Sequence, residues 1–171
     1  EAGVPSYIKS EADGWTPMGA AMRLAGRLVD DWTREHRESP APTVVNITDG
    51  VPTDDDAAEG TADEWAVQLQ GLETEDGACL LLNVGAPAVD GEPVRRAVFP
   101  NPSELPNDEG AERLWRMSSP LPPELLSRGK VHGLLHENAD GTDRRLYAQG
   151  TDETLLEKIF EFGTNPDGQP H

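Results

Sequence analysis

The spacing of apolar residues predicts two amphipathic helices in the first half of the chain. Between Pro17 and Glu35, apolar side chains recur at the spacing of one helical face, namely Met18, Ala21, Met22, Ala25, Leu28, Val29 and Trp32. Proline suits the first position of a helix and threonine is a good N-cap, so we expect this helix to begin after Thr16. A second helix is predicted after Thr61, with Glu64 completing a capping box.

Two apolar runs predict strands of a parallel sheet. Residues 43–48 form a β-branched run that ends in Asp-Gly, and residues 78–85 form a continuous apolar run that ends in glycine. A continuous apolar run is typical of a strand that is buried on both faces. The Asp-Gly pair also suits a hairpin turn, but Val51, Pro52 and the aspartates at 54–56 cannot pair as a return strand. Strands and helices therefore alternate, which indicates an α/β fold.

The second half of the chain predicts a less regular arrangement. A short helix is expected near residues 109–117, followed by an irregular stretch at 118–126 with one helical turn. Residues 130–136 and 144–149 are interpreted as the two strands of an edge hairpin. A final helix over 151–163 is predicted to place four apolar residues in the core, namely Leu155, Leu156, Ile159 and Phe160.

Length and charge narrow the class of protein. The 171 residues are enough for one domain with a real core. Asp and Glu outnumber Lys and Arg by 32 to 14, and the formal net charge of -18 repels phosphate backbones and anionic lipids. We therefore expect neither nucleic acid nor a membrane surface as a partner.

The expected compartment follows from the first residues, the apolar runs and the single cysteine. No apolar run approaches the roughly 20 residues that span a bilayer, and the first residues lack the charged and apolar regions of a signal peptide. Cys79 lies in an apolar run, where a thiol packs in the core and its pKa rises. A lone cysteine favours a reducing compartment, so the sequence predicts a cytoplasmic protein.

Two oxygen-bearing residues are predicted to share one edge of the sheet. Asp49 follows the strand at 43–48, and α/β sheets bind ligands at the carboxyl ends of their strands. Thr16 stands at the start of the helix that precedes this strand, so the chain connection favours a place at the same edge. Carboxylate and hydroxyl oxygens suit a hard cation such as Mg²⁺. Thr16 and Asp49 are therefore candidate metal ligands.

Two stretches resemble a known family. GWTPMGAAM at 14–22 looks like the threonine loop of the metal-ion-dependent adhesion site (MIDAS) of the von Willebrand factor A (VWA) domain, and ITDGVPTD at 47–54 looks like its aspartate loop. The resemblance implies that Thr16 and Asp49 are the matching ligands. It also implies a Rossmann-like, three-layer α/β/α sheet with mainly parallel strands. The order of elements is similar to that of the bacterial intracellular branch of the family.

One motif of the family is absent from the sequence. No Asp-x-Ser-x-Ser occurs in the 171 residues, and in the family that loop follows the first, central strand. Residues 1–163 are therefore interpreted as the C-terminal part of a VWA-like domain that is incomplete at its N-terminal side, and 164–171 as a flexible tail. The strand at 43–48 needs a neighbour on each edge, and the sequence offers one evident parallel partner. We expect an N-terminal segment or a second polypeptide to complete the sheet.

The resemblance implies protein recognition and not catalysis. In a complete site, Mg²⁺ keeps one position open for an Asp or Glu of a partner protein, and two protein ligands alone hold this ion weakly. Trp15 and Asp54 are expected at the rim of the site, although Trp15 can equally pack on its own helix. Asp54 is interpreted as a helix or loop cap, not as a direct ligand.

Three alternatives compete with a magnesium-dependent recognition module. The first is a scaffold of the same fold that uses no metal. The second is a metal-dependent hydrolase built on residues 54–56, which is disfavoured because consecutive aspartates diverge in direction. The third is a zinc pair at His132 and His136, which Gly133 and the predicted strand disfavour.

Overall fold

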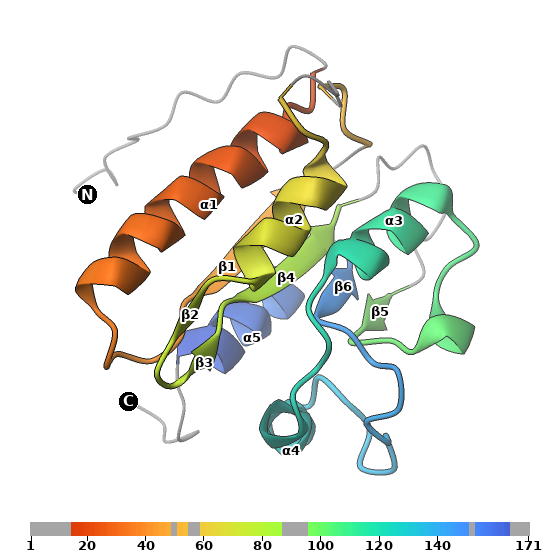
Figure 1. Ribbon diagram of the computed structural model, residues 1–171. Coiled ribbons are helices and arrows are strands. Elements are labelled where there is room, and N and C mark those ends of the chain that lie inside the picture. Colours follow the sequence, from red (N-terminus) through yellow and green to blue (C-terminus); the bar gives the residue numbers. More distant parts are fainter. Residues whose placement is uncertain (1–14, 49–50, 55–58, 87–95, 151–152, 165–171) are drawn as a thin grey trace, which may run out of the picture.

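The computed structural model describes residues 15–48, 51–54, 59–86, 96–150 and 153–164, which form a mixed α/β fold (Figure 1). Its main sheet has the strand order β1-β4-β6-β5 within these residues. Strands β1 (Thr43–Thr48), β4 (Leu80–Gly85) and β6 (Tyr147–Gln149) are parallel, and β5 (Ala97–Val98) pairs with β6 in the antiparallel sense. The predicted α/β class and the parallel pairing of 43–48 with the run near 80 are confirmed.

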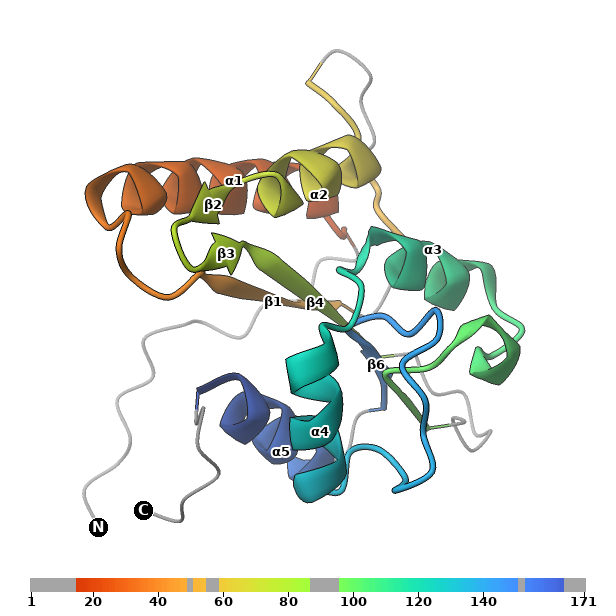
Figure 2. The ribbon, with the colours of Figure 1, turned by 60° about the horizontal axis from the view of Figure 1, so that its bottom comes forward.

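Helices cover both faces of this sheet (Figure 2). Helices α1 (Met18–Glu35), α2 (Ala62–Gln70) and α3 (Glu109–Met117) share one apolar cluster, which Leu81 joins from β4. Helices α4 (Pro123–Val131) and α5 (Glu153–Thr164) pack on the opposite face, where Leu82 joins the second cluster. Successive side chains of β4 thus point to opposite faces, as expected of a strand buried on both.

Local capping explains where two of these helices begin. The Glu64 backbone N–H donates to Thr61 Oγ1 at 3.3 Å, and the Thr61 N–H donates to Glu64 Oε2 at 2.8 Å, which is the predicted capping box of α2. In α3, the Ala111 N–H donates to Asp108 Oδ1 at 2.7 Å. Both helices are therefore capped by the residue that directly precedes them in the sequence.

The predicted hairpin of 130–136 with 144–149 is wrong. Helix α4 extends to Val131, and Gly133 follows it with a φ of +64°, which suits glycine at the end of a helix. The Leu134 N–H donates to the Gly129 carbonyl at 2.8 Å and the Gly133 N–H to that of Lys130 at 3.0 Å, which is a Schellman motif. Gly133 thus follows the end of a helix, α4, that is longer than the one helical turn predicted within 118–126.

Smaller differences concern the ends and faces of elements. Phe160 is 48% exposed although it was predicted in the core, because the buried positions of α5 are Leu155, Ile159 and Phe162. The sequence analysis also missed β5 and a short hairpin of β2 (Glu73–Thr74) with β3 (Gly77–Ala78). The run at 78–85 is therefore divided between β3 and β4.

Cys79 lies in the core, as predicted. Its side chain is buried, and desolvation raises the pKa of the thiol to about 11. The thiol is therefore protonated near neutral pH and is a poor nucleophile. Separately, the helices in the described part of the chain include none with the length and apolar character required to cross a membrane.

Candidate functional site

The loop at 51–54 closes on the start of α1. The Thr16 N–H donates to Thr53 Oγ1 at 2.9 Å, and the Thr53 N–H donates to the Thr16 carbonyl at 3.0 Å. Because this loop follows β1, the two hydrogen bonds hold the start of α1 near the carboxyl end of β1. Thr16 is thus joined to the loop that follows β1.

Asp54 caps α1 from a distant position in the sequence. Its Oδ1 accepts from the Gly19 N–H at 2.9 Å, and its Oδ2 accepts from the Ala20 N–H at 2.8 Å, although the residues are about 35 positions apart. The first N–H groups of a helix lack partners within the helix and favour a negative charge. The interpretation of Asp54 as a cap is confirmed. The prediction that Thr16 is the N-cap residue is wrong, because Pro17 takes that position, and the Pro17 side chain itself accepts no hydrogen bond from the helix.

The hydrogen bonds to Asp54 stabilise its charged form. Desolvation is the largest single influence and raises the pKa of Asp54, but the N–H groups of Ala20 and Gly19 lower it, and the net result is a pKa below the ordinary value. Glycine at position 19 permits this approach, because a Cβ there would lie 3.3 Å from the Asp54 carbonyl oxygen. Both carboxylate oxygens of Asp54 are therefore engaged by the helix.

The Thr16 side chain keeps its coordinating oxygen available within the described part of the chain. Its backbone makes hydrogen bonds to residue 53, but no hydrogen bond joins the Thr16 hydroxyl to another described residue. Asp49, the second predicted ligand, lies outside the described residues. Trp15 precedes α1 at the same end, and its side chain is 71% exposed.

The described residues do not by themselves form a complete magnesium site. Among them, no group of three His, Cys, Asp or Glu side chains could hold a metal ion. His132 and His136 therefore belong to no such group within the described residues. Asp54 is bound to the helix N–H groups, and of the predicted ligand pair Thr16 alone belongs to the described residues. Mg²⁺ prefers six oxygens, and one hydroxyl is too few. Asp55 and Asp56, which the hydrolase alternative needs, lie outside the described residues.

The edge of the sheet next to this site carries exposed apolar side chains, which sequence reasoning missed. Strand β1 is an edge strand of the described sheet, and Ile47 on it is 49% exposed. On α1, Leu24 and Leu28 are 59% and 61% exposed. The expectation that Leu28 belongs to the buried face of this helix is wrong, because Leu28, like Leu24, lies outside the face that carries Met18, Met22 and Val29.

The apolar side chains of α1 lie on the β1 side of the molecule. Gly26 faces α2, since a Cβ on it would lie 3.9 Å from Trp65 Cε3. Leu28 is two residues further on and therefore about 200° around the helix, on the side away from α2. Figure 1 shows α1 along the outer side of the sheet beyond α2. Leu24 and Leu28 are thus exposed on the side of α1 that faces away from α2.

Comparisons of the sequence and the structure with protein-family models, with curated proteins and with solved structures found no match.

Proposed function

We propose that this chain is part of a Rossmann-like domain of VWA type that serves protein recognition and is completed along β1 by a further segment. The observation that carries the proposal is that β1 is an edge strand among the described residues and has exposed apolar side chains beside it. An edge strand presents unpaired N–H and C=O groups and readily pairs with another strand. The segment that completes the sheet is an N-terminal part of the same domain or a second polypeptide.

The apolar border supports completion by a folded segment. Ile47 on β1 is exposed on the face of the sheet that α4 and α5 cover, since its paired residue Val84 and the alternate residue Val45 join the second cluster. Leu24 and Leu28 are exposed on α1, which covers the other face. Apolar side chains that gather beside a strand edge favour burial against another polypeptide, whereas single exposed ones need no explanation. A strand added to β1, with layers on both faces of the sheet, would cover all three side chains.

The second part of the proposal concerns Mg²⁺. Thr16 and Asp49 would be two of the ligands, and the remaining ones would come from the completing segment, its waters and an Asp or Glu of the partner protein. The available hydroxyl of Thr16 supports this assignment, as does its position at the carboxyl end of β1. When bound, the ion supplies a positive charge that a partner carboxylate recognises. We propose a cytoplasmic, non-enzymatic role.

Native mass spectrometry of the particle purified from its source tests the completion. We expect the particle to contain an Asp-x-Ser-x-Ser loop, either in a second polypeptide bound to this chain or in a preceding segment of the same chain. Tandem dissociation identifies which of the two is present. Hydrogen exchange should then show slower exchange of β1 amides in the particle than in the chain alone. A folded particle that holds this chain alone, with β1 amides exchanging freely, contradicts the completion.

Partner binding tests the metal separately. EDTA and the substitution Asp49→Ala should each abolish binding of the co-purified partner without unfolding the chain, while Asp31→Ala, which removes an exposed carboxylate from α1, should leave binding unchanged. Thr16→Ala should weaken it as well. Binding that survives both EDTA and Asp49→Ala supports the metal-independent scaffold instead.

A further inference from the structure

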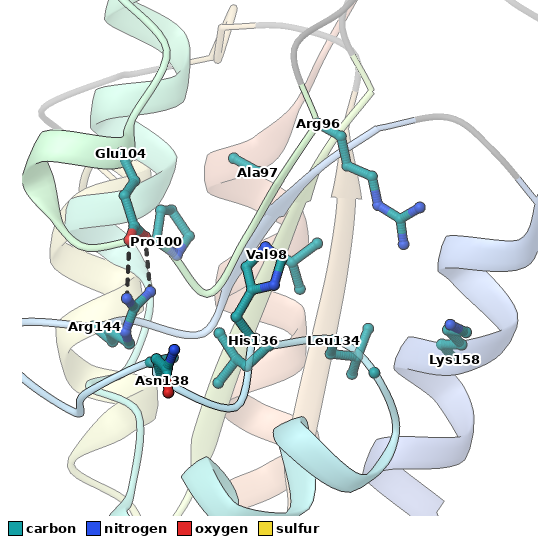
Figure 3. Close-up of a pocket in the computed structure, with 13 residues that line it drawn as sticks. Arg96, Ala97, Val98, Pro100, Glu104, Leu134, His136, Asn138, Arg144 and Lys158 are labelled. Carbon is teal, nitrogen blue, oxygen red and sulfur yellow. Dashed lines mark hydrogen bonds and ion pairs between the residues drawn. The ribbon is translucent and has the colours of Figure 1, made fainter.

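A second candidate site lies at the far edge of the sheet, and it shares no lining residue with the site at the start of α1. It is an open pocket of about 620 Å³ between β5, the turn after α4 and α5 (Figure 3). Val98, Leu134 and Leu135 supply apolar lining. Its volume lies within the range of roughly 300–1,000 Å³ that small-molecule sites occupy.

The lining is basic although the chain as a whole is strongly acidic. Arg96, Arg144 and Lys158 line the pocket against a single described carboxylate, that of Glu104. The formal net charge of the whole chain is -18. A local surplus of basic groups in such a chain attracts an anion to one place and leaves most of the surface repulsive to it.

The Arg144 side chain forms a fixed wall of the pocket. It is buried, and its Nη1 and Nη2 donate to Glu104 Oε2 and Oε1 at 2.7 and 2.9 Å. Its Nη1 also donates to the Phe99 carbonyl at 2.8 Å. This two-point contact neutralises Glu104 and holds the loop after α4 against the segment before α3. The pocket is therefore bounded by a structured loop on this side.

The remaining basic groups lie on the other side of the pocket. Figure 3 shows Arg96 and Lys158 on one side of the view, the Glu104–Arg144 pair on the other, and His136 between them. No described carboxylate forms an ion pair with Lys158. Its Nζ lies 3.5 Å from where a Cβ on Gly133 would be, so the missing side chain leaves room beside the ammonium group.

We propose that this pocket binds a small phosphate monoester, with the phosphate held by Lys158, Arg96 and His136 and a short apolar body against Val98 and Leu134. A phosphate monoester carries between one and two negative charges and three acceptor oxygens. Those oxygens can accept from a planar guanidinium, a tetrahedral ammonium and a ring N–H, and side chains of these three kinds line the pocket. The apolar lining favours an ester with a hydrocarbon part over the free ion.

Titration of the full ¹⁵N-labelled chain with phenyl phosphate, followed by amide chemical shifts, tests the proposal. We expect shifts centred on residues 96–98 and 133–139, and weaker binding as NaCl screens the charges. Lys158→Gln and Arg96→Gln should each weaken binding at least about tenfold, since a hydrogen bond between charged groups contributes that much. Lys130→Gln, a matched change on α4 outside the pocket, should leave the affinity unchanged.

Three outcomes would overturn the assignment. Equal weakening by Lys130→Gln would show that only the overall charge matters. Benzoate binding as tightly as phenyl phosphate would contradict the phosphate class, and inorganic phosphate binding as tightly would contradict the role of the apolar lining. Unchanged spectra of the variants away from the pocket show that each remains folded, so that weakened binding is not a loss of structure.

Discussion

The Asp54 carboxylate joins two segments that are distant in sequence. Both of its oxygens accept backbone N–H groups from the first turn of α1. The loop that carries Asp54 is also tied to Thr16 through Thr53. The side chains of Asp54 and Thr53 therefore position the start of α1 relative to the loop after β1, and with it the hydroxyl that the proposed metal site uses.

Substitution Asp54→Ala should destabilise the chain by about 1–2 kcal/mol, because the helix loses its cap and a favourable charge at its N-terminus. Urea unfolding followed by tryptophan fluorescence measures the change at neutral pH. Asp31→Ala removes an exposed carboxylate from the same helix and should change the free energy of unfolding by less than about 0.5 kcal/mol. Equal effects of the two substitutions would contradict the cap.

The same variant has a defined pH dependence. Because the folded state lowers the pKa of Asp54, the cap stabilises the chain fully above the unfolded-state pKa of 3.8, and this contribution is lost as pH falls through the lower folded-state pKa. The difference between the parent chain and Asp54→Ala should therefore shrink on acidification below about pH 4. A difference that stays constant to pH 2 would show that the charge of Asp54 contributes nothing.

At the scale of elements, Asn83 links two strands and a helix. It is fully buried in β4, and its Nδ2 donates to Ser118 Oγ at 3.0 Å and to the Leu114 carbonyl at 3.2 Å. Its Oδ1 accepts from Asn46 Nδ2 at 2.8 Å, on the paired residue of β1. Asn83 therefore ties β1 and β4 to the end of α3 through one amide.

Substitution Asn83→Ala should cost about 3 kcal/mol in the free energy of unfolding, because it leaves a cavity and removes the partner of buried polar groups. Asn46→Ala, at the half-buried end of the same hydrogen bond, should cost about 1 kcal/mol. Urea unfolding of both variants and of the double variant measures the coupling between them. A cost below about 1 kcal/mol for Asn83→Ala would show that the network contributes little.

At the scale of the whole molecule, net charge opposes the compact state. The formal net charge is -18, and folding brings the negatively charged side chains closer together. Their mutual repulsion therefore lowers the stability of the folded form. The described ion pairs, such as that of Arg144 with Glu104, act in the opposite direction. The balance between these effects depends on ionic strength.

Raising NaCl from about 10 mM to about 300 mM should increase the free energy of unfolding by on the order of 1 kcal/mol. The reason is that salt screens the repulsion between distant charges more than the attraction within close ion pairs. Urea unfolding is suitable because urea carries no charge. Potassium chloride at equal ionic strength serves as a control and should give the same increase. A decrease with salt would show that the ion pairs outweigh the repulsion.

Local patterns in the sequence were sufficient to predict several elements. The apolar spacing of α1, the Thr61 and Glu64 capping box and the buried run of β4 are all visible within a few neighbouring residues. Each depends on interactions over one or two turns or on the alternation of a single strand, so neighbouring residues carry the required information. The α/β class followed from the order of these elements.

The tertiary structure alone decided which distant groups meet. Asp54 replaced Thr16 as the cap of α1, residues 147–149 joined β4 instead of a hairpin, and Arg144 paired with Glu104. The same holds for the basic pocket and for the position of β1 at the edge of the described sheet, because both depend on how the whole fold arranges its surfaces. Contacts across 30 or more residues follow from packing of the whole chain, and a local pattern cannot specify them.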